Sequence, residues 1–300
     1  MEQLHADAAD QSPLWRRIVD FPLVAMLIAV LLYAFAITIA ILILQTLPAM
    51  RSDVSAVVHA AVFVGVGWFA YKVAIRHLGE RTRDDLPPDD AFKNLGRGLL
   101  AGLLLFGLVV AVAAAVGAYR ITGYGGTGEL VADIFAVAVM PGFMEELLFR
   151  GILFRWIEEF AGSWGALAVT SALFGLVHIM NPNATWFSSF AIALEAGVLL
   201  GGAYMLTRSL WMPMGLHAAW NFTQGFIFDV PVSGTEENGL VQAKLSGPAL
   251  LSGGPFGLEA SVIALVIATA AGVWLVLLAV RRGRLVQPRW VRRRLARAEP

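Results

Sequence analysis

The sequence predicts an all-α polytopic membrane protein, a transmembrane helical bundle of about eight spanning helices. Its 300 residues are 58% hydrophobic, and the mean hydropathy is +0.71. Charged residues make up only 15% of the chain, whereas soluble domains contain about 25%. Apolar runs near the ~20 residues that a helix needs to cross a bilayer recur along the whole chain. The formal net charge of zero argues against a nucleic-acid partner.

Eight stretches have the composition of spanning helices. They are residues 22–45, 54–75, 98–118, 131–156, 164–180, 185–207, 211–229 and 258–280. The first run is too long for a signal-peptide core and no small-residue cleavage site follows it, so we expect it to stay as a spanning helix. Residues 21–280 thus form the expected transmembrane domain, between an N-terminal cytoplasmic segment (1–20) and a basic cytoplasmic tail (281–300).

The loops predict that both termini are cytoplasmic. In that orientation, eighteen of the 22 Lys and Arg residues lie on the cytoplasmic side and three on the outer side. Such an excess of basic residues is typical of cytoplasmic loops. We therefore expect a multi-pass integral membrane protein, in the plasma (inner) membrane if its source is bacterial, with the basic tail on anionic lipid headgroups.

Two glycine pairs predict close packing between helices, because a spacing of four residues places both glycines on one helix face. They are Gly98 with Gly102 and Gly197 with Gly201. By contrast, the segment 230–257 is rich in Gly, Ser and Pro, and we expect it to be irregular.

Two adjacent carboxylates, Glu145 and Glu146, stand in the middle of the fourth span. A charged residue there costs roughly 2.5–3.5 kcal/mol on insertion scales, so such residues usually serve a function. Arg150 lies four residues after Glu146, on the same helix face, and should form an ion pair with it. Glu145 is rotated by about 100° and is free to act on water. Pro141-Gly142 should bend the helix just before them, which suggests a cavity.

Two further pairs on later spans have the same spacing. Phe174 precedes His178 by four residues, and His217 precedes Asn221 by four, so each pair shares a helix face. A carboxylate, two imidazoles and an amide in one low-dielectric cavity could activate water and hold an oxyanion. For Glu195, in the sixth span, we expect a structural hydrogen bond, the alternative being that it lines the same cavity.

The strings EELLFR, FGLVH and HAAWN resemble the three motifs of the CAAX protease and bacteriocin-processing (CPBP) family, also called the abortive-infection family, which is related to type II CAAX prenyl endopeptidases. They occur in the family's order within about residues 130–229. The resemblance implies a membrane-embedded endopeptidase. The site residues it implies are Glu145, Glu146, Arg150, His178, His217 and Asn221.

The roles that the resemblance implies divide these residues into pairs. Glu145 with His178 would activate the attacking water, and His217 with Asn221 would stabilise the oxyanion. Glu146 with Arg150 would orient the site.

Whether a metal takes part is left open by the motifs. Family members are described as metalloproteases, and if a zinc ion is bound, Glu145, His178 and His217 could be its ligands, leaving one position for water. The sequence contains no HExxH motif and no cysteine, so thiolate zinc sites and cysteine proteases are excluded. The cofactor is thus unknown, with zinc as the candidate.

The expected partners are the lipid bilayer and a substrate that is a peptide or a membrane protein, with or without a lipid attached. No isoprenylated CAAX substrate follows from the sequence. One alternative is a proton-coupled membrane transporter, in which Glu145, Glu146 and the histidines form a relay. A relay needs titratable groups strung across the membrane, whereas these cluster and include Asn221, which cannot titrate. The other alternative is a non-catalytic peptide-binding membrane scaffold.

Overall fold

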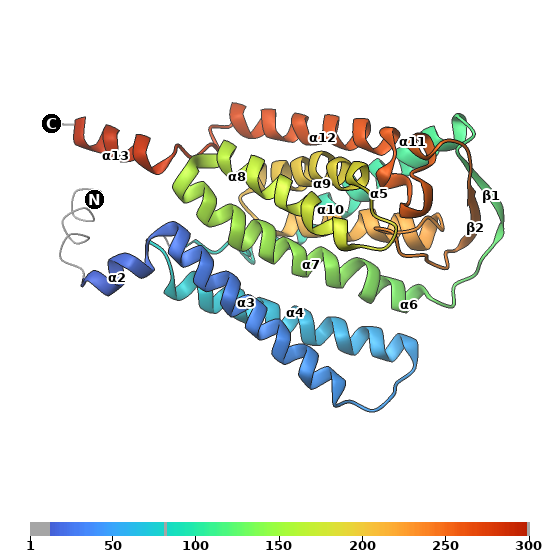
Figure 1. The fold of residues 1–300 in the computed structure, drawn as a ribbon, viewed down its shortest axis with the longest axis horizontal. Helices are drawn as coiled ribbons and strands as arrows, with labels where there is room; N and C mark the ends of the chain where they lie inside the picture. Colours follow the sequence, from blue (N-terminus) through green and yellow to red (C-terminus); the bar gives the residue numbers. More distant parts are fainter. Residues whose placement is uncertain (1–12, 81–82, 299–300) are drawn as a thin grey trace.

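A computed structural model describes residues 13–80 and 83–298, so the first twelve positions of the predicted N-terminal segment and the last two of the tail lie outside it. This part of the chain is mostly helical (Figure 1). Its first helices are α2 (Leu14–Val19), α3 (Pro22–Gln45), α4 (Ser52–His77) and α5 (Ala91–Ala115). After α5 come strand β1 (Tyr119–Tyr124), α6 (Leu130–Ala132), the π-helix η1 (Asp133–Val139), α7 (Met140–Glu146) and the π-helix η2 (Leu147–Phe154).

The second half of the chain continues with α8 (Arg155–Val177), the 3₁₀ turn η3 (His178–Met180), α9 (Trp186–Thr207), α10 (Trp211–Phe222) and the π-helix η4 (Thr223–Ile227). It ends with strand β2 (Val241–Leu245), α11 (Ala249–Ser252), the 3₁₀ turns η5 (Gly254–Phe256) and η6 (Leu258–Ala260), α12 (Val262–Arg281) and α13 (Arg289–Ala298).

Within the described residues, six helical stretches are long and apolar enough to cross a membrane. They are α3, α4, α5, the stretch Leu130–Met180, α9 and α12. The predicted seventh span corresponds to α10 and η4, of 12 and 5 residues, which form a shorter helix inside the bundle. Eight membrane crossings and the cytoplasmic termini therefore stay predictions.

The stretch Leu130–Met180 folds back on itself at Gly162. Its 51 residues would extend about 77 Å as one helix, far more than the ~30 Å of a hydrocarbon core. Gly162 interrupts the helix with φ 78° and ψ 172°. Phe149 and Phe174, nearly equidistant from Gly162 along the chain, contact each other with ring centroids 4.8 Å apart. The two halves therefore run antiparallel, as expected for separate fourth and fifth spans.

Replacing Gly162 with alanine should destabilise this reversal. Its backbone lies in a region that is essentially restricted to glycine, and a non-glycine residue there costs about 1–3 kcal/mol. An added Cβ would also lie 2.9 Å from the Pro288 ring. We expect the Gly162→Ala protein to melt at a lower temperature in detergent, whereas Gly96→Ala, where a Cβ meets nothing within 4 Å, should melt like the parent. Equal melting temperatures for both variants would contradict this account.

The first glycine pair brings α5 against α10. A Cβ on Gly98 would lie 2.2 Å from the Met212 carbonyl oxygen, and one on Gly102 would lie 2.4 Å from the Leu216 carbonyl oxygen. Only glycine permits this backbone approach, so the pair fixes the position of α10, which carries the HAAWN motif.

The second glycine pair brings α9 against α8. A Cβ on Gly197 would lie 2.7 Å from Ser171 Cα, and one on Gly201 would lie 2.6 Å from the Leu167 side chain. Both pairs thus confirm the predicted close packing of helices.

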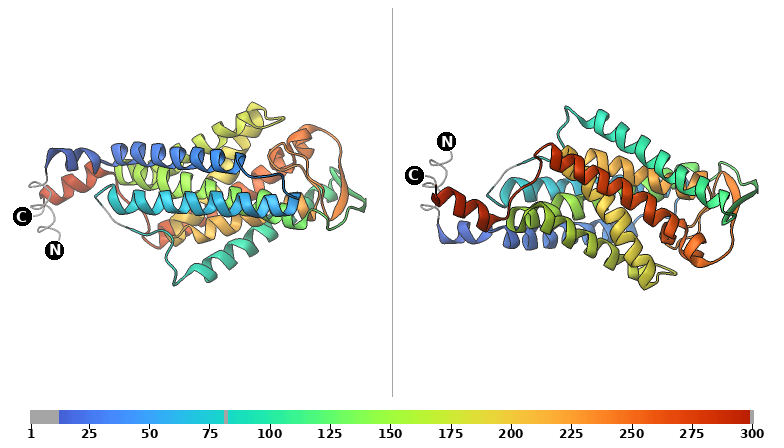
Figure 2. Two further views of the ribbon diagram at one scale, coloured as in Figure 1. Left: turned by 90° about the horizontal axis from the view of Figure 1, so that it is seen from below. Right: turned by 90° about the horizontal axis from the view of Figure 1, so that it is seen from above.

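The prediction that residues 230–257 are irregular is wrong in part. Val241–Leu245 forms β2, which pairs antiparallel with β1 so that Tyr119 lies opposite Leu245. This small sheet lies at the end of the bundle opposite α2 and α13 (Figures 1 and 2). The two strands are far apart in the sequence, and no short turn connects them, so local patterns could not reveal the pairing.

The predicted basic tail contains the helix α13, which packs against α8. The Trp290 and Phe160 rings contact each other with centroids 5.9 Å apart, and the Arg292 guanidinium donates to the Glu159 carbonyl oxygen at 2.7 Å. Helices α2 and α13 lie at the same end of the molecule (Figure 2), an arrangement compatible with both termini on one side of a membrane.

Candidate active site

Four of the predicted site residues line one cavity of about 260 Å³. Glu145 comes from α7, His178 from the junction of α8 and η3, and His217 and Asn221 from α10. Three motifs separated along the chain therefore meet around one space. Ser233 and its neighbours in the loop after η4 complete the lining.

Glu146 and Arg150 lie behind this cavity and hold His217. Arg150 Nη1 donates to Glu146 Oε1 at 2.8 Å, and both side chains are fully buried. His217 Nδ1 lies 3.0 Å from the same oxygen. Because a carboxylate oxygen accepts, Nδ1 carries the proton and the Nε2 atom of His217 is left for the cavity. The predicted pairing of Glu146 with Arg150 is confirmed.

Arg150 also connects two of the motif helices with α9. Its Nη2 donates to the carbonyl oxygens of Ala196 at 3.2 Å and Gly197 at 3.4 Å, both on α9. The guanidinium lies 4.7 Å from the centroid of the Phe174 ring on α8, within the range of a cation–π contact. One buried arginine thus contacts α7, α8 and α9.

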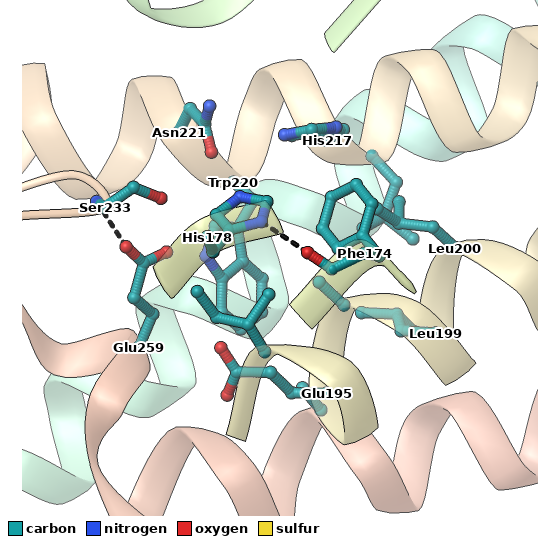
Figure 3. A pocket seen from close by; sticks show the side chains of 14 residues that line it. Phe174, His178, Glu195, Leu199, Leu200, His217, Trp220, Asn221, Ser233 and Glu259 are labelled. Carbon is teal, nitrogen blue, oxygen red and sulfur yellow. Dashed lines mark hydrogen bonds between the residues drawn. The ribbon is translucent and has the colours of Figure 1, made fainter. Parts of the chain in front are cut away.

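The backbone of the FGLVH motif orients His178. His178 Nδ1 lies 2.6 Å from the carbonyl oxygen of Phe174, which can only accept (Figure 3). Nδ1 therefore carries the proton, and Nε2 keeps a free lone pair. Phe174 contributes twice to the site, since its ring contacts Arg150 and its carbonyl sets the tautomer of His178.

Glu145 is half-buried, and its carboxylate accepts no hydrogen bond from the described residues. Its Oε2 atom is buried without a partner, on a side chain that lines the cavity. The backbone beside it is fixed, because the Tyr33 hydroxyl on α3 donates to the Met144 carbonyl oxygen at 2.8 Å. A free carboxylate oxygen at a cavity wall is suited to accept a proton from water.

Asn221 bonds to the backbone of η1, just before the proline of α7. Its Nδ2 donates to the Val137 carbonyl oxygen at 3.0 Å. Val137 lies four residues before Pro141, which has no N–H to give to that oxygen. One N–H of the Asn221 amide is thereby used, and the second N–H and the oxygen remain. At the position of the expected bend, Pro141-Gly142, the helix continues as α7 with a π-helix on either side.

The proposed zinc ligands do not form a metal site in this arrangement. Over residues 13–80 and 83–298, no group of three or more His, Asp or Glu side chains is placed to hold a metal ion. Glu145, His178 and His217 line the same cavity without converging on one point at ligand distances. The positions of these three side chains thus do not fit a zinc ion, and the chemistry below uses the protein's own groups.

A smaller space of about 30 Å³ adjoins the two histidines, and it exceeds the ~10–15 Å³ that one water molecule needs. Glu195 lines it and is buried, and its Oε2 has no hydrogen-bond partner (Figure 3). The expected structural hydrogen bond is thus not made by this oxygen, and Glu195 lines the smaller space rather than the larger cavity of Glu145.

The residues that sequence reasoning missed come from segments after η4. Glu259, in η6, lines the smaller space and accepts a bond from the Ser233 amide. Burial raises the pKa of Glu259 to about 7. Glu237 lines the larger cavity. Glu259 stands at the very start of the predicted eighth span and Glu237 in the segment expected to be irregular, and neither belongs to a motif, so no periodic signal indicated its position.

Comparison with known proteins agrees with the geometry. Residues 127–223 match a protein family described as "Type II CAAX prenyl endopeptidase Rce1-like". The protein is therefore of the intramembrane protease class. Residues 127–223, about a third of the chain, thus form a domain of the CPBP family. No curated protein and no solved structure matches the chain.

Proposed function

We propose that the protein is an intramembrane endopeptidase that hydrolyses a peptide bond through water activated by Glu145 and His178. The observation that carries this proposal is that two hydrogen-bond acceptors without a partner face one cavity. Glu145 Oε2 has no partner, and His178 Nε2 is left free by the bond from Nδ1 to Phe174. Two acceptors can hold a water molecule by its two O–H groups and leave an oxygen lone pair to attack a carbonyl carbon.

In the proposed reaction the water oxygen bonds to the carbonyl carbon while a water proton passes to Glu145. The carbonyl π electrons move onto its oxygen, which becomes the oxyanion. When the C=O bond re-forms, the C–N bond breaks and Glu145 returns the proton to the leaving nitrogen. The same carboxylate thus serves as base and then as acid, and the atoms balance without a further reactant.

His217 and Asn221 are the proposed oxyanion donors. Asn221 keeps one uncommitted N–H beside the cavity. His217 can donate from Nε2 in its charged form, for which Glu146 at Nδ1 supplies the counter-charge. Donors fixed before the substrate binds stabilise developing charge without reorganisation. The rigid Glu146–Arg150 pair is proposed to keep His217 in that orientation.

A proton-coupled transporter is less compatible with this site. A relay needs ionisable groups that continue across the membrane, whereas Glu145, His178 and His217 surround one cavity. We further propose a multi-pass position in a membrane, the plasma (inner) membrane if the source is bacterial, with the end that carries α2 and α13 in the cytoplasm, because basic residues concentrate there.

The proposal is tested with purified protein in detergent and a synthetic peptide mixture, with new termini identified by mass spectrometry. The parent should cleave, and His178→Ala should lower the rate at least about 100-fold, because it removes one of the two water acceptors. The control is His59→Ala on α4, since His59 does not line the cavity and its ring bonds to Ser55 of its own helix. Cleavage by His178→Ala at the control rate would contradict the proposed role.

A further inference from the structure

Glu237 lies in the wall of the same cavity as Glu145, on the loop between η4 and β2. The loop is closed by Asp229, whose carboxylate accepts from the amides of Gly239 at 3.1 Å and Ala243 at 2.8 Å. The stem of Glu237 packs over Gly225, where an added Cβ would meet Glu237 Cγ at 3.1 Å. The hydrogen bonds of the loop and the packing over Gly225 thus fix the position of Glu237.

The surroundings of Glu237 are acidic. The cavity lining contains no lysine or arginine, and no described side chain or amide bonds the Glu237 carboxylate. The titratable groups that share its cavity are Glu145, His178 and His217. Burial and the nearby Asp133 raise the pKa of Glu237 to about 7. Asp133 is itself buried and its Oδ2 has no partner. Two carboxylates thus share this region of the protein without a cation.

A half-buried carboxylate without a partner lacks the hydrogen bonds that offset its loss of water. A guanidinium or ammonium group entering the cavity would supply a charge-assisted hydrogen bond to it. Since Glu237 and Glu145 line one cavity of about 260 Å³, a cation bonded to Glu237 lies close to the proposed point of attack.

We propose that Glu237 is a specificity-determining residue, which selects substrates with an Arg or Lys side chain next to the peptide bond that is cleaved. The inference rests on the proposed peptidase function and adds the substrate class. Glu237 binds the basic side chain and takes no part in the proton transfers of Glu145. Charge complementarity of this kind discriminates between substrates more than it raises overall affinity.

The test compares two quenched peptides that differ only in arginine or citrulline next to the cleaved bond, because citrulline keeps the shape and lacks the charge. The parent protein should prefer the arginine peptide about 10- to 100-fold in kcat/KM, the worth of a hydrogen bond to a charged group. Glu237→Gln should abolish the preference. Glu236→Gln is the matched control, since the neighbouring Glu236 is exposed and does not line the cavity, and it should keep the preference.

The pH dependence gives a second readout with a defined sign. Glu237 is protonated below its pKa of about 7 and ionised above it. The ratio of the two kcat/KM values should therefore rise from pH 6 to pH 8 in the parent and stay flat in Glu237→Gln. The ratio cancels titrations of Glu145 and the histidines, which affect both peptides alike.

Direct binding separates this inference from the proposed function. Fluorescein-labelled hexapeptides with arginine or citrulline are titrated with the protein and followed by anisotropy, which needs no hydrolysis. Tighter arginine-peptide binding that Glu237→Gln removes supports the inference, even if neither peptide is cleaved and the peptidase proposal fails. Equal binding, or an equal preference in Glu237→Gln, overturns the inference, and so does a Glu237-dependent rise in melting temperature with Zn²⁺ or Ca²⁺ alone and no peptide preference.

Discussion

Glu145→Gln should abolish most of the peptide hydrolysis and leave the fold unchanged. The substitution keeps the size and polarity of the side chain and removes the oxygen that accepts the water proton. A general base usually contributes about 10²–10⁴-fold to the rate, so we expect kcat to fall by at least that range. Because Glu145 Oε2 has no partner among the described residues, the change breaks no internal bond and the melting temperature should stay close to that of the parent.

The control for this variant is Glu236→Gln, the same change at an exposed position. Its turnover should match the parent. The assigned role of Glu145 is wrong if the purified Glu145→Gln protein turns over peptides as fast as this control.

Arg150→Ala should have the largest effect on stability. Removing Arg150 leaves Glu146 buried without its counter-charge, and the carbonyl oxygens of Ala196 and Gly197 lose a donor. Breaking a buried ion pair from one side typically costs about 3–5 kcal/mol. We expect a lower yield of folded protein and a lower melting temperature in detergent. Activity should also be lost, because Glu146 without Arg150 no longer holds His217 in a fixed orientation.

The comparison for Arg150→Ala is Arg51→Ala, which removes an exposed ion pair to Asp53. Surface pairs of this kind contribute little, so Arg51→Ala should melt like the parent. Arg150→Lys tests the geometry, because an ammonium group cannot reach Glu146 and the α9 carbonyls with a planar fork. If Arg150→Ala accumulates and melts like Arg51→Ala, the ion pair is not what stabilises the site.

The parts of the site that lie on helices could be predicted from the sequence. Four-residue spacing places two side chains on one face whatever the tertiary structure, so the Glu146–Arg150 pair followed from the spacing alone. The spacing of Gly98 and Gly102 likewise indicated a close helix contact, which proved to be with α10.

The contacts between segments could not be predicted in the same way. Which partner His217 binds depends on how α10 packs against α7, and the spacing of His217 and Asn221 contains no information on that. Asn221 is an example, because its bond to the Val137 carbonyl oxygen depends on how α10 packs against η1.

The loops, and the helix that changes between α and π geometry around α7, were the least predictable parts. Glu237 reaches the cavity because the loop after η4 is closed by Asp229, and composition alone only suggested an irregular segment. The π-helices around α7 change which residues face the cavity, and an ideal α-helical period does not anticipate them. The zinc hypothesis had the same limit. The sequence offered side chains of the right type, but the distances between them depend on how the helices pack.

The central claim is that water in the cavity of Glu145 and His178 cleaves a peptide bond, and solvent-oxygen labelling tests it most directly. Purified protein is incubated with the peptide mixture in ¹⁸O-enriched water, and the new C-termini are weighed by mass spectrometry. The account predicts that each cleavage by the parent places one ¹⁸O atom in the new carboxylate, and that Glu145→Gln produces almost none of these termini. Labelled products that form equally fast with Glu145→Gln, or no cleavage by the folded parent, would contradict it.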